Sequence, residues 1–483
     1  MQNQFLQQWS NHIQNMDEVV EQLELQTVIA VGVTPYPRII PSLFLDKQHF
    51  QIYCVHDSAD IAVLRNYAQV ACMEQVDPKV AQKVHSTEYL MRNYVFQSFL
   101  KSQRYPYSLL LHTTTPPIIK YVKEQNIPWI GNDPKIFEPL LHKKGFKELL
   151  VNLRIEYLPD WVMSKEEFYG KRFTELQKKW NKAVVAQPGD YEVSGSTYFI
   201  HNEDDLSKAF EFYNNPERFE RVQKIKLTPF VTGNAVSMLG CVMDSGILTS
   251  PLQLQLIDVP EALHDQPPTG AFFGHDWGYK SWSEQTAKDA QTAVEQIGRW
   301  LSKRGYRGIF GVDFIHDQES DKVYPLECNP RFTGAIPAYS EINILNGVAP
   351  IDFMSLVAQL RIPIKFDFNA MNELWKKPTN AAHIAIVPNG VEQMKVPLNA
   401  GVYTYHEQER SLEYLRPGAF LHELKNDQEF LIIDQVPKVG KVISQNVPRL
   451  FKFIFNTSIA EASNRIKPLQ GQILNSMAKL LRR

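Results

Sequence analysis

The 483-residue sequence has few cysteines, only four, at positions 54, 72, 241 and 328, and no two of them form a CxxC motif. Proteins held together by disulfides contain many more cysteines, and structural zinc sites need closely spaced ones. The cysteine content therefore argues against a disulfide framework and against a zinc site, and it favours a reducing compartment.

An excess of charge of one sign is also absent. Lysine and arginine together number 51 and the acidic residues 53, which gives a net charge of −2. Proteins whose main partner is nucleic acid or an anionic membrane surface usually have a strongly basic region or balance. We therefore expect neither nucleic acid nor a membrane as the main partner.

Long hydrophobic runs are missing as well. No apolar stretch approaches the length of a transmembrane helix, and residues 1–22 are polar and lack the hydrophobic segment of a signal peptide. These absences predict a cytoplasmic protein. The length predicts roughly three domains, and a hydrophobic content of 44% is ample for packed cores.

The first 130 residues alternate between short apolar segments and amphipathic ones. Buried strands are predicted at 27–33, 51–55, 107–112 and 127–131, with amphipathic segments at 60–69 and 86–102. This order is typical of an α/β domain with a mainly parallel sheet. TPYPR follows the first strand in place of a G-x-G-x-x-G turn, so a dinucleotide site is poorly supported.

Two loops of this region follow predicted strands, Thr34–Arg38 and Thr113–Pro117. Ligands of open α/β sheets often bind at the carboxyl ends of strands. The two loops are either part of a ligand site or simple connections between elements.

Residues 305–337 carry the most informative pattern. Apolar strands at 309–315 and 323–326 flank the polar turn HDQESD, as in a β-hairpin. Asp313 lies on the first strand, and Glu327 and Asn329 end the second, two residues apart and so on one face. Carboxylate and carboxamide oxygens suit Mg²⁺ held against nucleotide phosphates. Arg331 follows on that face, where a cation can hold a transferring phosphoryl group. The alternative is an ordinary acidic hairpin whose Asn and Pro end a strand.

The spacing D-x13-E-C-N-P-R resembles the metal-binding end of the ATP-grasp superfamily. The resemblance implies that Asp313, Glu327 and Asn329 bind the magnesium ions of MgATP, with Mn²⁺ as a possible substitute. It also implies that Arg331 stabilises the transferred phosphate or a substrate carboxylate. The resemblance is close over 305–337 and extends in layout over 27–345.

Further segments resemble the phosphate-binding part of the same superfamily. A lysine that opens a helix and reaches the α-phosphate corresponds to Lys143 or Lys144, and Lys143 is the favoured choice. The predicted strand 182–188 is followed by a small-residue loop that looks like the glycine-rich flap. Many members have lysine where this chain has glutamine, whereas some peptide-ligating branches have glutamine. The implied phosphate contacts of strand and flap are Gln187, Ser194, Gly195, Ser196 and Thr197.

Residues 224–248 predict a strand, a linker and a strand pair. By the same resemblance, the adenine-binding hinge spans Thr228 to Val231 and includes Phe230, with Lys226 as a neighbour of adenine or phosphate. Thr228 and Ala235 stand where related enzymes often have acidic residues, which leaves nucleotide selectivity less well defined.

Residues 250–279 are predicted to form a long loop that lines a site. His264, His275, Asp276 and Trp277 in it are candidates for contacts with the acceptor substrate, or for structural roles. Beyond residue 350, short strands are predicted at 383–390, 401–406, 411–416, 429–437 and 441–445. They resemble the mainly β C-terminal lobe of several ATP-grasp ligases.

The predicted fold is thus a combination of α/β and α+β: an ATP-grasp fold with an N-terminal Rossmann-like (pre-ATP-grasp) domain and a mainly β C-terminal lobe. The predicted boundaries are 1–133 for the first domain, 134–350 for the ATP-grasp domain, and 351–483 for the C-terminal lobe with a terminal helix. Within the ATP-grasp domain, the small lobe covers about 160–232 and the large lobe about 233–350.

The leading functional hypothesis is an ATP-dependent carboxylate–amine ligase acting on amino acids or short peptides. It would form an acyl phosphate and release ADP and phosphate. Dimers are common among related enzymes, so the resemblance also implies a homodimer. One alternative is a phosphotransferase of the same fold. Another is an inactive nucleotide-binding module, which Gln187, Thr228 and Ala235 favour and the complete hairpin set argues against.

Overall fold

The computed structural model describes residues 2–190, 196–263, 270–387, 391, 393–443 and 449–482. It combines a parallel sheet, a small antiparallel sheet and a large antiparallel sheet, together with a two-stranded ribbon, β21 (Ala460–Ala462) and β22 (Arg465–Ile466). This arrangement confirms the predicted combination of α/β and α+β architecture. Within the described ranges, no helix is both long and apolar enough to cross a membrane.

The N-terminal domain is built on a five-stranded parallel sheet. Its strand order is β3-β2-β1-β4-β5. The four predicted strands are present, and β3 is an additional edge strand that the pattern did not reveal because its sequence QVAC is short. The bounds are β1 (Thr27–Gly32), β2 (Phe50–Cys54), β3 (Gln69–Cys72), β4 (Tyr107–Leu111) and β5 (Trp129–Ile130).

The two faces of this sheet belong to different cores, because side chains alternate along a strand. In β1, Val28 and Ala30 face the main core of the molecule, whereas Ile29 and Val31 face a second, local core. The second core is covered by short helices of the same domain. The helices of this domain are α1 (Gln2–Trp9), α2 (Met16–Leu23), α3 (Asp60–Leu64), α4 (Met73–Val76), α5 (Pro78–Ala81), α6 (Thr87–Met91), α7 (Tyr94–Lys101) and α8 (Pro116–Glu124).

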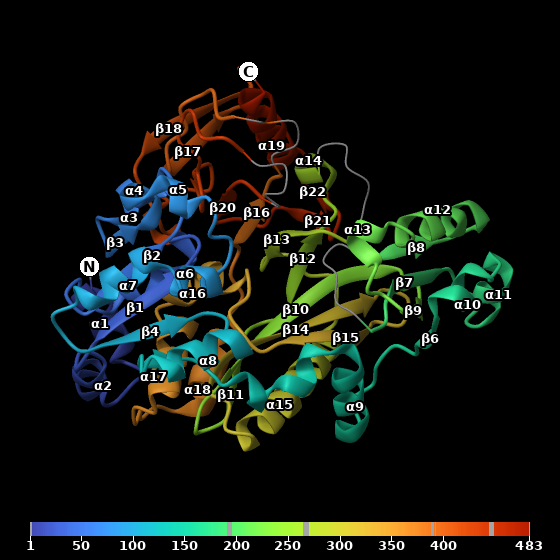
Figure 1. The fold of residues 1–483 in the computed structure, drawn as a ribbon, viewed down its shortest axis with the longest axis horizontal. Helices are drawn as coiled ribbons and strands as arrows, with labels where there is room; N and C mark the ends of the chain where they lie inside the picture. Colours follow the sequence, from blue (N-terminus) through green and yellow to red (C-terminus); the bar gives the residue numbers. More distant parts are fainter. Residues whose placement is uncertain are drawn as a thin grey trace.

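The small lobe has a hydrophobic core of its own, separate from the other two. Its antiparallel sheet has the order β6-β9-β7-β8 and projects to one side of the molecule in Figure 1. Helix α9 (Lys143–Leu153) precedes it. The other elements are β6 (Trp161–Ser164), α10 (Lys165–Tyr169), α11 (Phe173–Lys178), β7 (Val184–Pro188), β8 (Tyr198–Ile200), α12 (Glu203–Tyr213), α13 (Pro216–Phe219) and β9 (Lys224–Pro229).

The large sheet runs through the rest of the chain. Its order is β15-β14-β10-β12-β13-β16-β20-β19-β17-β18, with β11 also paired to β10. The pairing of β13 with β16 carries the sheet across the predicted domain boundary at residue 350. The strands are β10 (Gly233–Val242), β11 (Ile247–Thr249), β12 (Gln253–Ile257), β13 (Phe272–Asp276), β14 (Gly308–Asp317), β15 (Lys322–Asn329), β16 (Ala382–Ala385), β17 (Gly401–His406), β18 (Ser411–Arg416), β19 (Phe430–Ile433) and β20 (Lys452–Phe455).

Helix α15 (Glu284–Lys303) packs along this sheet. Its buried residues recur every three or four positions, and the Ser283 side chain caps its first turn by accepting from the Thr286 amide at 3.1 Å. Gly298 allows a close approach to Ile247, because a Cβ there would lie 2.8 Å from that side chain. The remaining helices are α14 (Pro260–Leu263), α16 (Ile336–Leu345), α17 (Ile351–Leu360), α18 (Phe368–Trp375) and α19 (Pro468–Leu481).

Two sequence-based expectations are changed by the structure. The predicted long loop at 250–279 is wrong over much of its length, because β12 and β13 lie inside the large sheet with neighbours on both sides. The predicted strand at 441–445 is represented among its described residues, 441–443, by a single bridge between Gln393 and Val442. Residues 444 and 445 lie outside the described residues.

Candidate nucleotide and metal site

The hairpin of β14 and β15 brings the predicted metal-binding side chains together. Asp313 and Glu327 are direct partners in the strand register. Asn329 donates from Nδ2 to Asp313 Oδ2 at 2.9 Å and to Glu327 Oε1 at 3.0 Å. The three side chains therefore form one connected polar group on the face that the sequence predicts.

A β-bulge sets the direction of Glu327. Asp313 pairs with Glu327, but Phe314 pairs with Pro325, so Leu326 has no partner in the register. Leu326 and Glu327 are consequently both exposed, whereas Cys328 is buried. Bulges commonly redirect a side chain in this way. Cys328 thus faces the core, on the side opposite Glu327 and Asn329.

The electrostatics of this group suit a divalent cation. Burial and the neighbouring Glu327 carboxylate raise the pKa of Asp313 well above its usual range. Gln255 on β12 donates to Asp313 Oδ1 at 2.8 Å. Two carboxylates side by side repel each other, and a bound Mg²⁺ would remove that repulsion. No group of three or more His, Cys, Asp or Glu residues that could hold a metal ion occurs in the described ranges, and the third polar side chain beside Asp313 and Glu327 is the amide of Asn329.

Arg331 extends the polar chain toward the N-terminal domain. Its Nη2 donates to Asn329 Oδ1 at 2.9 Å, and Nη1 donates to the Phe332 carbonyl at 3.1 Å. The Phe332 ring stacks on His112 at the end of β4, with centroids 3.9 Å apart and planes 5° from parallel. Arg331 is thus an exposed cation that stands between the hairpin and the carboxyl end of the parallel sheet.

The two candidate lysines of α9 differ in position. The Lys143 ammonium lies 3.4 Å from Gln187 Oε1 and 3.2 Å from the Pro188 carbonyl, both on β7. The Lys144 side chain is 87% exposed and its ammonium lies 3.8 Å from Glu148. Of the two, Lys143 therefore faces the flap strand.

Basic and amide groups gather on the adjoining face of the small lobe. Gln187 is the register partner of Lys226 on β9, and it donates from Nε2 to Thr197 Oγ1 at 2.9 Å. Burial lowers the pKa of Lys226, although the Asp160 carboxylate acts in the opposite direction. This face can therefore bind phosphate oxygens.

The flap is described in part. Ser194 and Gly195 lie outside the described residues, whereas Ser196 is buried, and its carbonyl lies 2.8 Å from the Tyr213 hydroxyl. Thr197 lies against the large lobe, since a Cβ on Gly270 would be 3.4 Å from Thr197 Cβ. The end of the flap thus bridges the two lobes.

The predicted hinge is the connection between β9 and β10. The Phe230 amide donates to the Ala183 carbonyl at 2.8 Å, and the Phe230 ring packs edge-on against His201 with centroids 4.9 Å apart. Thr228 and Val231 are half-buried on either side. The structure therefore places the predicted hinge where the chain passes from the small lobe to the large lobe.

The acceptor candidates of residues 250–279 have structural positions. Asp276 is buried, and its Oδ2 accepts from the amides of Ile459 and Ala460 at 2.6 and 2.8 Å, which ties β13 to the C-terminal lobe. His275 is buried within the large sheet, and Trp277 is buried just after β13. His264 lies outside the described residues. Much of this segment is therefore strand rather than loop, and it reaches the site through Gln255 on β12, whereas Asp276, His275 and Trp277 are buried within or beside the sheet.

Sequence reasoning missed several polar residues near the site. Gln255 holds Asp313, and the alternation of polar and apolar residues in QLQLI was the pattern that could have identified its strand. Arg38 lies far from Arg449 and Lys452 in the sequence, and no local pattern links it to them.

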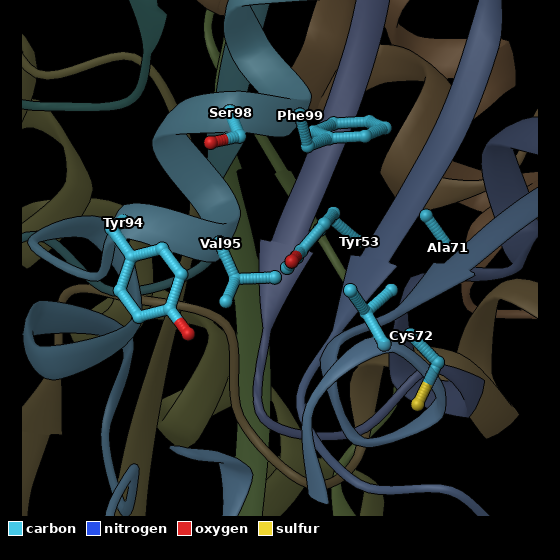
Figure 2. Close-up of a pocket in the computed structure, with 8 residues that line it drawn as sticks. Tyr53, Ala71, Cys72, Tyr94, Val95, Ser98 and Phe99 are labelled. Carbon is cyan, nitrogen blue, oxygen red and sulfur yellow. The ribbon is translucent and has the colours of Figure 1, made fainter.

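A separate hollow of about 310 Å³ lies beside β3 in the N-terminal domain. Figure 2 shows Tyr53, Val95 and Phe99 around it, with the Cys72 sulfur at its edge. Its lining is mostly apolar and includes none of the candidate site residues, so we assign it no part in the chemistry.

Comparison with solved structures identifies the fold. The biotin carboxylase of Campylobacter jejuni, solved with a β,γ-ATP ligand, matches with a TM-score of 0.59 and 12% identity over 95% of this chain and 96% of that one. The biotin carboxylase domain of the Hydrogenobacter thermophilus 2-oxoglutarate carboxylase, a dimer with MgADP, ADP and bicarbonate, matches with a TM-score of 0.57 and 14% identity, covering 89% and 86%.

A third match is the Aspergillus clavatus N5-carboxyaminoimidazole synthase with ADP and 5-aminoimidazole ribonucleotide, with a TM-score of 0.51, 9% identity, and coverage of 95% and 100%. These likenesses confirm the predicted ATP-grasp fold. Neither the protein-family models nor the curated proteins contain a match to this sequence.

Proposed function

We propose that this chain is an ATP-dependent ligase that activates a carboxylate as an acyl phosphate and joins it to an amine. The observation that carries the proposal is the connected group of Asp313, Glu327, Asn329 and Arg331 on one hairpin. Three structural neighbours with ADP or an ATP ligand share the fold and support the use of ATP.

The nucleotide phosphates would lie between the hairpin and the basic face of the small lobe. Asp313, Glu327 and Asn329 would hold Mg²⁺, or Mn²⁺ in its place. The bound ion would offset the negative charge of the β- and γ-phosphates during transfer. Lys143, Gln187 and Lys226 would bind phosphate oxygens from the opposite side, with the flap residues Ser194 to Thr197. The hinge at Thr228 to Val231, including Phe230, would contact adenine.

The carboxamide of Asn329 constrains how the group works. Its Nδ2 faces the two carboxylates and its Oδ1 accepts from Arg331. Coordination of a cation through Oδ1 would require the carboxamide to rotate, which would release the guanidinium. Arg331 would then be free to bind the transferred phosphoryl group or the substrate carboxylate, and positioning and charge would supply most of the catalysis.

We further propose amino acids or short peptides as the acid and the amine. The support for this class is the glutamine at position 187, which resembles the peptide-ligating branches of the superfamily. A homodimer and a cytoplasmic location are also part of the proposal. The four free, buried cysteines agree with a reducing compartment.

The experiment that tests the proposal measures ADP and phosphate release with MgATP against a panel of amino acids and dipeptides. Release that requires both an acid and an amine supports the ligase. Release that requires an acceptor but no amine would indicate a phosphotransferase. Tight binding of ATP without any release on a broad panel would indicate the nucleotide-binding module.

A further inference from the structure

A group of charged residues lies next to the candidate site and takes no part in the proposed handling of ATP. It consists of Arg38 from the N-terminal domain and Asp434, Arg449 and Lys452 from the C-terminal lobe, and we call it the basic cluster. With three cations and one carboxylate, it has an excess of positive charge. Arg38 and Arg449 have no ion pair within 4.0 Å in the part of the chain that the structure describes.

Arg38 is held in a fixed position at the carboxyl end of β1. It ends the 3-10 turn η1 (Tyr36–Arg38), and it donates from Nε to the Val31 carbonyl at 2.9 Å and from Nη1 to the Thr34 carbonyl at 2.8 Å. Its guanidinium lies directly on Gly32, because a Cβ at that position would be 1.9 Å from Nη2. The absence of a side chain on Gly32 therefore makes room for the cation.

The C-terminal lobe supplies the rest of the basic cluster. The Lys452 ammonium lies 2.9 Å from Asp434 Oδ2, and the Arg449 guanidinium lies over the Phe272 ring, 5.0 Å from its centroid. Burial lowers the pKa of Arg38 to about 10 and also lowers the pKa of Arg449, whereas the Asp434 carboxylate raises both. Asp434 therefore lies within electrostatic range of both arginines.

The backbone around Asp434 is strained, and a buried carboxylate holds it. Asp434 and Gln435 have φ values of 72° and 74°, in a region that residues other than glycine rarely occupy. Asp60 on α3 accepts from the amides of Asp434, Gln435 and Val436 at 2.9, 2.9 and 3.0 Å. Strained backbone that its surroundings maintain is concentrated at functional sites.

Two sets of contacts between neighbouring residues connect the basic cluster with the surroundings of Arg331. On one side, His112 stacks on Phe332, and burial, with a smaller contribution from the Arg38 charge, lowers the pKa of this histidine well below its usual range. On the other side, a Cβ on Gly334 would lie 3.4 Å from the Phe272 ring that Arg449 covers. An acid whose carboxylate reaches Arg331 can therefore extend toward Arg38 and Arg449.

We infer that the basic cluster binds a second anionic group of the acid substrate, a carboxylate or a phosphate, while the carboxylate to be activated lies at Arg331. This inference rests on the proposed ligase function and narrows the substrate to acids with an additional negative charge. A positive, partly buried site selects against neutral analogues because its charges would be left without a partner.

The direct test is calorimetric titration of inorganic phosphate and of glutarate into the full chain with MgADP. Arg449→Met should weaken anion binding by about 10- to 100-fold, because one charge-assisted hydrogen bond is lost. Arg449→Lys should recover part of the affinity. Arg299→Met, on the exposed surface of α15, is the matched control and should bind as the wild type does.

Glu327→Ala separates the basic cluster from the metal site, because phosphate could also bind through a cation held by Asp313, Glu327 and Asn329. Binding that survives in Glu327→Ala and is lost in Arg449→Met supports the inference. Preference for phosphate would indicate a phosphorylated acid, and preference for glutarate a dicarboxylic one. The inference is overturned if neither anion binds, or if Arg449→Met leaves binding unchanged.

Turnover distinguishes this inference from the proposed function. Glutamate is compared with glutamine, and O-phosphoserine with serine, with hydroxylamine as the amine. Hydroxylamine attacks the acyl phosphate, forms a hydroxamate and releases phosphate. Equal kcat/KM for the charged and neutral members of each pair would overturn the basic cluster as a specificity site and leave the ligase intact. Anion binding without ADP release for any acid would overturn the ligase and leave the anion site.

Discussion

The hairpin of β14 and β15 and the basic cluster are built in opposite ways. The hairpin takes its four polar side chains from 19 consecutive positions, 313 to 331, and one pair of strands aligns them. The basic cluster takes its charges from positions 38, 434, 449 and 452, which belong to two parts of the chain separated by almost the whole sequence. The first is a local motif, and the second exists only after the domains have packed.

This difference indicates which group is expected to carry out the reaction and which is expected to select the substrate. A motif fixed by one hairpin supplies the same groups in any protein that has it. A group assembled from an N-terminal turn and a C-terminal lobe depends on how two domains meet, so it can vary between proteins of one fold. We therefore expect the hairpin to determine the reaction and the basic cluster to select the acid.

The largest expected effect is on the hairpin. Glu327→Ala should lower ADP release by roughly 10²–10³-fold because a donor for the cation is lost. The exposed side chain contributes little to the core, so thermal unfolding should change little. Steady-state ADP release measures the first effect. Glu319→Ala, in the turn of the same hairpin, should retain activity, and comparable losses in both variants would contradict the metal role.

The second prediction compares neighbouring lysines on α9. Lys143→Met should raise the KM for ATP by about 10- to 100-fold, because the ammonium beside Gln187 and Pro188 would no longer be available to phosphate. Lys144→Met should change KM by less than about twofold, since its side chain is largely in solvent. Initial rates at varied ATP concentration give the KM of each variant. A larger increase in KM for Lys144→Met than for Lys143→Met would assign the phosphate contact to Lys144.

The third prediction tests whether the basic cluster depends on position as well as on charge. Gly32→Ala leaves every charge in place, but the new Cβ would displace the Arg38 guanidinium. Anion affinity should fall by about tenfold, and the overpacking should lower the free energy of unfolding by about 1–3 kcal/mol. Calorimetry and urea unfolding measure the two effects. Gly170→Ala is the control, because its nearest neighbour would be 3.6 Å away. Unchanged anion binding in Gly32→Ala would exclude Arg38 from the site.

The fourth prediction concerns Glu341, which links the two parts of the chain that form the basic cluster. Glu341 on α16 accepts from the Tyr36 hydroxyl at 2.9 Å and from the Leu421 amide, and burial raises its pKa to about 8. In the unfolded chain the pKa of Glu341 has its ordinary value near 4.5. The stabilisation linked to the raised pKa is therefore fully present below about pH 4.5 and is lost as the pH rises toward 8.

Glu341→Gln should therefore reduce the fall in Tm between pH 5 and 8. In the wild type, ionisation of Glu341 over this range lowers the free energy of unfolding by on the order of 2–4 kcal/mol. The amide can accept from Leu421 and donate to the Tyr36 oxygen, as a protonated carboxyl does. Scanning calorimetry across this range measures the effect. Glu148→Gln, on the solvent side of α9, serves as the control. An equally steep decline in Glu341→Gln would show that another group is responsible.

Local patterns predicted the elements that carry the hairpin and the parallel sheet. The apolar runs that became β1, β2 and β4 and the polar turn between β14 and β15 each depend on contacts over a few residues. The pattern failed for β13, because FFGHD is a short strand with buried His and Asp side chains. The partners of those side chains, such as the amides of Ile459 and Ala460, come from a distant segment.

By itself the sequence determined the ATP-grasp fold, the order of its parts and the hairpin with Asp313, Glu327, Asn329 and Arg331. Strand period and turn composition fix the hairpin within a short stretch of chain, whereas the fold and the order of its parts follow from the resemblance of D-x13-E-C-N-P-R to the ATP-grasp superfamily. The tertiary structure alone decided which lysine of α9 faces the flap strand, that Gln255 holds Asp313, and that Arg38 meets Asp434, Arg449 and Lys452. Such groups come together because burying the shared core packs the N-terminal sheet against the C-terminal lobe. No pattern along the chain records that packing.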